Sequence, residues 1–299
     1  MKEQKNINID FFKVDEDALP FVEITFMGMD SKMHTALMLM DSGSSVNTLM
    51  TEMRVLISES DWLPEESDEV VTVTNEATRV PCGKFQFELD GESFQEKFYF
   101  FENQHLMQID DMMFVGVLGN RFMQKYRLAI DYSKMSIHTS TIKLETLRAG
   151  KCKFIIPLEY GLKNYNAPIL NLNGSEYNPI VVADTGCDDL TISKKAIEDN
   201  NLSYQLTGRV LPIVGPNGSF EANECILDFS FTTHFDNDFN KQSYQETAEI
   251  LPYSLNVTDE GECDEDGKLL SPIDGMIGSP FMARHKWVLD FGGKVIYRL

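Results

Sequence analysis

The chain contains an internal repeat, and this repeat restricts its possible folds more than any other feature. Gly116–His138 and Gly275–Tyr297 align without a gap, with glycine, phenylalanine, methionine and aspartate at matching positions. Each matched segment closes one half of the 299-residue chain. Repeated segments of this kind indicate one structural unit used twice. We therefore predict two similar lobes, residues 1–145 and 146–299, joined near a charged linker.

A second pair of matching segments lies near the start of each half. The apolar run LMLM leads into Asp41 and a Ser-Gly turn, and the run PIVVA leads into Asp184 and a Thr-Gly turn. An unpaired carboxylate in apolar surroundings is costly or becomes protonated. Taken alone, either aspartate fits a residue that caps a turn in contact with water. The same order in both halves favours a functional site instead.

The segments between these landmarks read as β-strands. Val70–Phe101 and Gly208–Phe235 alternate with period two and are interrupted by turn sequences. Helical patterns are short and occur at Gly119–Tyr126 and Ser193–Asn200. The expected fold class is mostly β.

Charge and composition exclude several classes of partner. Asp and Glu number 47 against 26 Lys and Arg, which gives a net charge of −21. This sign argues against nucleic-acid phosphates and anionic lipids as partners. No run of about 18 apolar residues is present for membrane insertion, and no signal-peptide core is visible. The five cysteines show no CxxC spacing, so we expect free thiols and a cytoplasmic location.

The sequence gives little support for a metal ion or a cofactor. The acidic loop Thr258–Lys268 has Ile273 where a calcium-binding loop needs a glutamate. His234, Asp236 and Asp238 are weak ligand candidates. Motifs of zinc peptidases, serine hydrolases and nucleotide-binding loops are absent. We expect neither a cofactor nor a metal.

With its segments in this order, the sequence resembles the aspartic peptidases, which include pepsin-like and retropepsin-like members. The resemblance covers nearly the whole chain. It implies the acid-protease fold, in which two β-barrel-like lobes related by a pseudo-two-fold axis hold an active site in the cleft between them. It also implies that the two Asp-Ser/Thr-Gly turns meet there, each cradled by an apolar-apolar-Gly segment, Val117–Gly119 and Met276–Gly278.

The residue types at the two turns suit hydrolysis of a peptide bond by water. Two carboxyl groups about 3 Å apart cannot both ionise, so Asp41 and Asp184 would share one proton. One then acts as base and the other as acid on a single water. Gly43 and Gly186 permit the turns and would touch a peptide or protein substrate in extended conformation. We expect a monomeric aspartic endopeptidase.

Four further turn residues are expected to support the pair. The resemblance assigns Ser42 and Thr185 to hydroxyl contacts that reach across to the partner loop. Ser44 matches a pepsin-like hydroxyl that hydrogen-bonds the carboxylate. Cys187 stands at the equivalent place in the second half and is a weaker donor, so we expect the pair to be harder to ionise and the working pH to rise.

The segment expected to cover a substrate departs from the pepsin-like pattern. Thr72–Pro81 contains no tyrosine, and each half instead offers a hairpin candidate, at Asn75-Glu76 and at Asn217-Gly218. This arrangement resembles a retropepsin dimer fused into one chain. An alternative stays open, in which the fold is kept to bind peptides or proteins without turnover. Cys187 and the unusual hairpins would suit that alternative.

Overall fold

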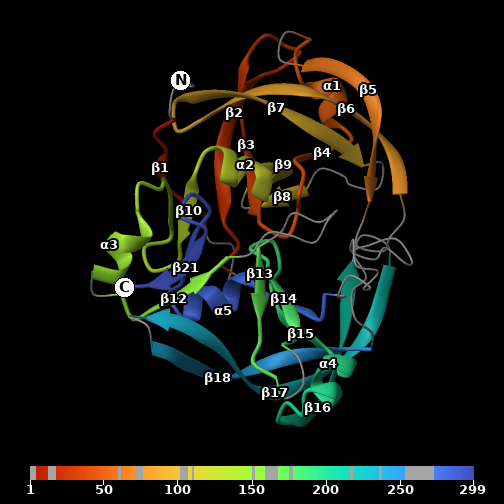
Figure 1. The fold of residues 1–299 in the computed structure, drawn as a ribbon. Helices are drawn as coiled ribbons and strands as arrows, with labels where there is room; N and C mark the ends of the chain where they lie inside the picture. The colour runs from red at the N-terminus through yellow and green to blue at the C-terminus, as the bar shows by residue number, and fades with distance from the viewer. Residues whose placement is uncertain are drawn as a thin grey trace, which may run out of the picture.

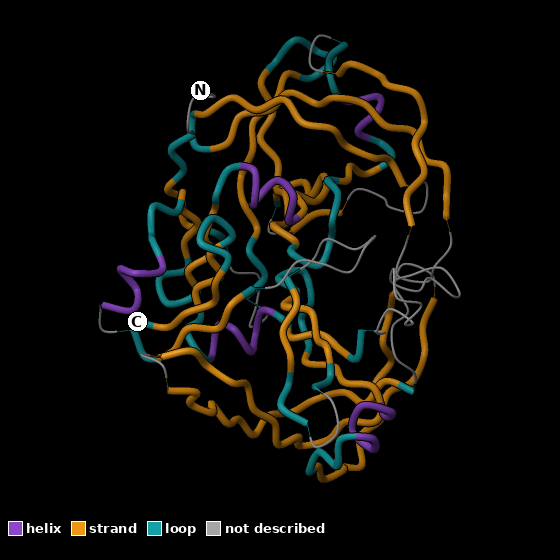
Figure 2. Tube along the Cα trace, in the orientation of Figure 1, coloured by secondary structure: helices purple, strands orange, loops and turns teal. Residues whose placement is uncertain are grey.

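The computed structural model consists mainly of β-strands, and its helices are short, as the trace in Figure 2 shows. None of the helices in the described part of the chain is long and apolar enough to cross a membrane. The structure describes residues 5–12, 18–59, 62–71, 77–101, 107–109, 111–149, 152–158, 168–174, 178–215, 218–235, 238–252 and 273–299.

The first half of the chain forms an eight-stranded sheet with strand order β2-β3-β9-β4-β7-β6-β5, in which β8 also pairs with β9. One short helix, α1 (Met53–Leu56), follows β4. The strands are β2 (Phe21–Met27), β3 (Met33–Asp41), β4 (Thr48–Met50), β5 (Trp62–Val71), β6 (Ala77–Leu89), β7 (Glu92–Phe101), β8 (Met107–Ile109) and β9 (Met112–Gly119).

The second half forms a seven-stranded sheet with strand order β13-β14-β19-β15-β18-β17-β16. Helix α4 (Lys194–Asp199) follows β15, close to the helix expected from the sequence. The strands are β13 (Ile169–Asn171), β14 (Ile180–Ala183), β15 (Leu190–Ser193), β16 (Tyr204–Gly215), β17 (Gly218–Phe235), β18 (Asp238–Leu251) and β19 (Gly275–Ile277).

The two sheets have the same pattern of strand pairing around the turn aspartates, which confirms the two similar lobes expected from the repeat. The strand before each turn aspartate, β3 or β14, runs parallel to β9 or β19. The strand after each turn, β4 or β15, runs antiparallel to that same neighbour and parallel to β7 or β18. In Figure 1 one lobe occupies the upper half of the view and the other the lower half.

A six-stranded sheet draws on both halves and joins the lobes, at the left of Figure 1. Its order is β1-β11-β10-β20-β21-β12, and the two halves meet where β10 pairs antiparallel with β20. The predicted boundary at residue 145 falls inside helix α3 (Leu144–Ala149) and stays a prediction. The strands are β1 (Asn8–Asp10), β10 (Leu128–Asp131), β11 (Ser136–Thr139), β12 (Phe154–Pro157), β20 (Val288–Asp290) and β21 (Val295–Arg298).

Aromatic side chains fill much of the core of both lobes. Phe85, Phe87 and Phe98 pack with ring centroids 5.5 to 5.9 Å apart in the first lobe. Phe281 and Trp287 meet edge-on at 5.1 Å in the second. Burying one phenylalanine contributes about 1.5–3 kcal/mol. Such packing fixes where each apolar strand ends, and therefore where each aspartate begins its turn.

Two short helices explain why the repeat has Phe and Met at the same distance after its second glycine in both copies. Helix α2 (Asn120–Lys125) buries Phe122 and Met123, and helix α5 (Ser279–Arg284) buries the matching Phe281 and Met282. Each helix starts directly after the glycine that closes β9 or the glycine that follows β19. The short helix expected near Gly119–Tyr126 is thus confirmed.

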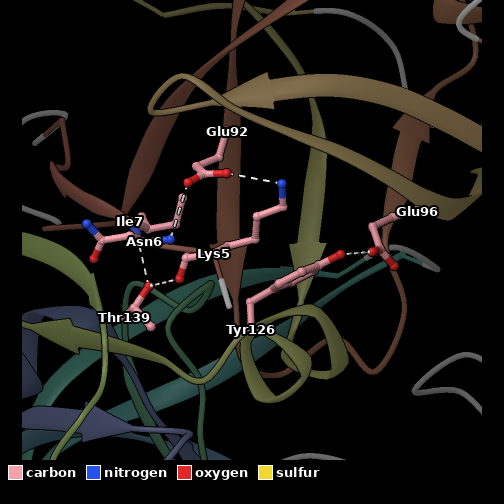
Figure 3. A network of polar contacts seen from close by, with 7 residues as sticks. All are labelled: Lys5, Asn6, Ile7, Glu92, Glu96, Tyr126 and Thr139. Atoms are coloured by element: carbon pink, nitrogen blue, oxygen red, sulfur yellow. Dashed lines mark hydrogen bonds and ion pairs between the residues drawn. The ribbon is translucent and has the colours of Figure 1, made fainter. Parts of the chain in front are cut away.

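The N-terminal segment is tied to the first lobe by polar contacts drawn in Figure 3. Lys5 Nζ lies 3.0 Å from a carboxylate oxygen of Glu92 on β7. The Thr139 hydroxyl accepts the Ile7 N–H at 2.9 Å and donates to the Lys5 carbonyl at 3.0 Å. These contacts hold β1 at the edge of the six-stranded sheet.

Each lobe carries a β-hairpin at the position expected for a substrate-covering segment. Strands β5 and β6 pair up to Val71 and Ala77, and strands β16 and β17 pair up to Gly215 and Gly218. In Figure 1 the described ends of the two hairpins point toward each other at the right. The predicted substrate contacts Asn75, Glu76 and Asn217 lie outside the described residues, whereas Gly218 begins β17.

Candidate active site

Parallel strand pairing places each turn aspartate beside the neighbouring parallel strand of its own lobe. Strand β3 ends at Asp41, whose register partner on β9 is Gly119. Strand β14 ends one residue before Asp184, whose N–H donates to the Ile277 carbonyl of β19 at 3.0 Å. The residues of β3 and β14 that precede the aspartates are mostly buried, as expected for strands covered on both faces. This burial explains why both runs are continuously apolar.

The carboxyl groups of Asp41 and Asp184 hydrogen-bond to each other across the lobe boundary. Backbone N–H groups orient each of them from its own turn. The Ser44 N–H donates to Asp41 Oδ1 at 3.0 Å, and the Gly186 N–H donates to Asp184 Oδ1 at 2.9 Å. The two carboxyl groups therefore face one another in a fixed geometry.

The turn glycines make room for this approach. A Cβ added to Gly43 would lie 2.2 Å from Asp184 Oδ2, and one added to Gly186 would lie 2.6 Å from Asp41 Cγ. No side chain larger than hydrogen fits at either place without moving the carboxyl group of the opposite lobe. The glycines are thus required by the contact between lobes, in addition to any turn preference.

Burial raises the pKa of both carboxyl groups, and their interaction with each other separates their tendency to ionise. Burial, then the charge of Asp41 and the hydrogen bond to it, raise the pKa of Asp184 well above its ordinary value. Burial also raises the pKa of Asp41, but the hydrogen bond from Asp184 and the N–H groups of Ser44 and Gly43 oppose this rise. The two carboxyl groups therefore titrate as a pair that shares one proton, and the pKa of Asp184 is raised further than that of Asp41.

Two buried hydroxyl groups interlock the turns. The Ser42 hydroxyl donates to the Ala183 carbonyl, and the Thr185 hydroxyl donates to the Met40 carbonyl, both at 2.5 Å. Each side chain is fully buried. These are the cross-lobe contacts expected for Ser42 and Thr185, and they hold the ends of β3 and β14 together.

Ser44 and Cys187 occupy equivalent places but do not contact the carboxylates with their side chains. The Ser44 hydroxyl donates to the Val46 carbonyl at 2.8 Å, so the bond expected from this hydroxyl to Asp41 is replaced by one from the backbone. The Cys187 thiol likewise donates to the Asp189 carbonyl at 3.5 Å. The expectation that a weak Cys187 donor makes the pair harder to ionise therefore loses its physical basis.

Burial and the charge of Asp184 raise the pKa of the Cys187 thiol well above its ordinary value. The thiol is neutral at physiological pH, which makes it a poor nucleophile. This agrees with a packing role for Cys187.

The sequence did not predict three side chains that support the turns through hydrogen bonds. Asn120 Nδ2 donates to the carbonyls of Ser42 and Ser44 at 3.1 and 3.0 Å. On the other side the Ser279 hydroxyl donates to the Thr185 carbonyl at 2.7 Å.

The third such residue, Tyr132, hydrogen-bonds Ser279. Its hydroxyl lies 2.6 Å from Ser279 Oγ, so a buried chain of hydrogen bonds links the residue that follows strand β10 of the first half to the turn of the second. Asn120 and Ser279 could have been found from the repeat, because they are the polar residues that directly follow its second glycine.

A separate cavity of about 570 Å³ lies in the second lobe. Its lining includes Asn201, Asp228, Lys241 and Tyr244 but neither turn aspartate. It is therefore distinct from the candidate site. Among the described residues, no group of three or more His, Cys, Asp or Glu side chains could hold a metal ion.

Comparison with known proteins supports the fold. No protein-family model matches the chain, and no curated protein sequence does. A crystal structure of an aspartic proteinase from Irpex lacteus is similar, with a TM-score of 0.53 and 11% sequence identity. The similarity covers 98% of this chain and 96% of that one. At this identity the likeness shows the bilobal fold and carries no statement about activity.

Proposed function

We propose that this chain is an aspartic endopeptidase that hydrolyses peptide bonds with a water activated by Asp41 and Asp184. The observation that carries the proposal is the hydrogen-bonded carboxyl pair, in which burial raises the pKa of both groups, so that one proton is shared and one group is protonated while the other is charged. General acid–base catalysis needs these two states side by side at the pH of the reaction.

The chemistry follows from that pair. The Asp41 carboxylate takes a proton from water as the water oxygen bonds to the peptide carbonyl carbon, and Asp184 gives its proton to the carbonyl oxygen. Protonated Asp41 then donates to the leaving nitrogen as the C–N bond breaks. Asp184 recovers a proton from the hydroxyl of the intermediate, which restores the starting state.

We further propose a retropepsin-like arrangement within one chain, active as a monomer. Both turns belong to the same chain, and each lobe contributes its own hairpin, β5–β6 and β16–β17. Two hairpins that cover a cleft from both sides are what a fused retropepsin dimer would possess. An extended peptide would lie between them and pair with strand edges.

Replacing each carboxylate by its amide tests the proposal. Asp41→Asn and Asp184→Asn are each expected to lower turnover of a peptide library by about 10³-fold or more, because one pair performs both proton transfers. Asp228→Asn is the matched control, since Asp228 contacts Gln245 at the surface, away from both turns. Circular dichroism checks that every variant is folded.

The outcomes separate catalysis from binding. Turnover retained in either amide variant would exclude the shared-water mechanism. If the wild-type protein binds peptides in calorimetry but cleaves none between pH 4 and 8, the chain is a peptide-binding module with the same fold.

A further inference from the structure

Glu249 on β18 is a buried carboxylate with an incomplete set of partners. Its side chain is 6% exposed, and Oε2 has no hydrogen-bond partner among the described residues. An unsatisfied carboxylate in such a place is unfavourable for folding. A residue of this kind calls for a role outside the stability of the lobe.

Strand pairing places Glu249 close to the candidate active site. Its register partner on β15 is Thr191, seven residues after Asp184. The strand order β14-β19-β15-β18 puts three strand spacings, about 14 Å in total, between the strand that leads to Asp184 and the strand of Glu249. Side chains of an extended peptide a few residues from the cleaved bond span that distance.

The charges of three further carboxylates act on Glu249. Burial, then the charges of Asp189, Asp188 and Glu224, raise the pKa of Glu249 to about 7. Glu224 is its cross-strand neighbour on β17 and is already paired with Arg209 at 2.9 Å. Asp188 and Asp189 are exposed and belong to the turn of Asp184 itself. The group thus reaches from the turn to a buried carboxylate.

The first lobe has no equivalent of this group. The strand pairing there puts Tyr99 in the place of Glu249 and Cys82 in the place of Glu224. Ser45 and Val46 stand where the second lobe has Asp188 and Asp189. Since the same fold forms without these carboxylates, their presence in one lobe is not a structural requirement.

We propose that Asp188, Asp189, Glu224 and Glu249 form an acidic subsite that takes a lysine or arginine side chain of the substrate. The proposal rests on the endopeptidase function proposed above and names its specificity. The ammonium or guanidinium group would donate to Glu249 and offset the repulsion among the carboxylates. Asp188 and Asp189 would attract the cation at the exposed rim.

The test compares peptides that differ at one residue. A parent peptide cleaved by the wild-type enzyme is made with lysine, arginine, norleucine or glutamate at each position in turn around the cleaved bond. We expect kcat/KM to favour lysine and arginine over norleucine by at least about tenfold at one position. Glu249→Gln should remove most of that preference by lowering kcat/KM for the lysine and arginine peptides toward the value for the norleucine peptide.

Two variants serve as controls for Glu249→Gln. Glu246→Gln removes a charge from the same strand, but Glu246 contacts Arg284 and His285 instead of the acidic group, so the preference should persist. The double variant D188N/D189N alters only exposed side chains and should also reduce the preference. It keeps the proposal testable if Glu249→Gln does not fold.

If the wild-type enzyme has the same kcat/KM for lysine and norleucine peptides at every position, the subsite is overturned and the endopeptidase function stands. A wild-type protein that cleaves no peptide would overturn the endopeptidase instead. In that case calorimetry with a lysine peptide and its norleucine counterpart decides the subsite. Lysine-dependent binding that is lost in Glu249→Gln supports it, and equal binding excludes it.

Discussion

The backbone N–H of Ser42 donates to the Thr185 hydroxyl at 2.9 Å, and the backbone N–H of Thr185 donates to the Ser42 hydroxyl at the same distance. The relationship is reciprocal and crosses the lobe boundary. Both hydroxyls also donate to a carbonyl of the opposite lobe, so every polar atom of the two side chains is used. The position of one aspartate therefore depends on the turn that carries the other.

Thr185→Val should reduce both stability and turnover. The change removes the acceptor of the buried Ser42 N–H and a donor to the Met40 carbonyl, and a buried group left unpaired costs about 1–3 kcal/mol. Thr139→Val is the matched control, because Thr139 also accepts one N–H and donates to one carbonyl, but far from the turns. Urea unfolding and kcat should show loss of both in Thr185→Val and unchanged kcat in Thr139→Val. Equal kcat in the two variants would contradict a role in aligning the pair.

Asp184 should make the protein less stable as the pH rises. Its pKa is raised in the folded state, so the folded protein binds more protons than the unfolded chain above about pH 4. The contribution of Asp184 is therefore fully favourable below its unfolded pKa and is lost as the pH rises through its folded pKa. The free energy of unfolding of Asp184→Asn, compared with wild type from pH 4 to 8, should fall less steeply. Parallel curves would show that Asp184 is not buried in the protonated form.

Gly186→Ala should abolish turnover at a modest cost in stability, because the new methyl group would lie against the Asp41 carboxyl group. The control is Gly91→Ala at the β6–β7 turn, where the positive φ of 71° costs about 1 kcal/mol but no atom lies within 4 Å. Both variants should lose stability, and only Gly186→Ala should lose kcat/KM. Full activity in Gly186→Ala would mean that the carboxyl groups are not held in contact.

Cys187→Thr should leave the acidic limb of the pH profile in place, within about half a pH unit. A hydroxyl here would donate to the Asp189 carbonyl, as Ser44 donates to Val46, and would not reach the Asp184 carboxylate. The profile of kcat/KM against pH for wild type and variant gives the answer. A shift of a full unit toward acid would restore the direct contact that the sequence suggested.

The sequence predicted the lobes and the carboxyl pair because both are encoded locally and twice. An apolar strand followed by Asp-Ser/Thr-Gly leaves few structural solutions when it recurs in order. The Ser44 hydroxyl was assigned to the wrong acceptor because a serine in a turn can satisfy its own backbone equally well. Tyr132 was missed because its partner, Ser279, is distant in sequence and shares no local pattern with it.

The six-stranded sheet could not be predicted for a related reason. Its strands are only three or four residues long, too short for an alternating pattern to identify. The pairing of β10 with β20 depends on tertiary packing of the lobes, in which Ile130 faces Leu289. The two segments were recognised as copies of each other, but nothing in the copies says that they pair.

The pairing of β10 with β20 means that the two halves of the chain should hold together without a covalent link. If the backbone were opened in α3, each fragment would expose a strand edge, β10 or β20, whose complement lies on the other fragment. The fragments are expected to reassociate as a heterodimer, because the seam and the interlocked turns do not depend on chain continuity. The covalent link through α3 ensures that each first half is joined to one second half, although the two halves now differ in sequence. This one-to-one arrangement allows four carboxylates to exist beside one aspartate and not beside the other.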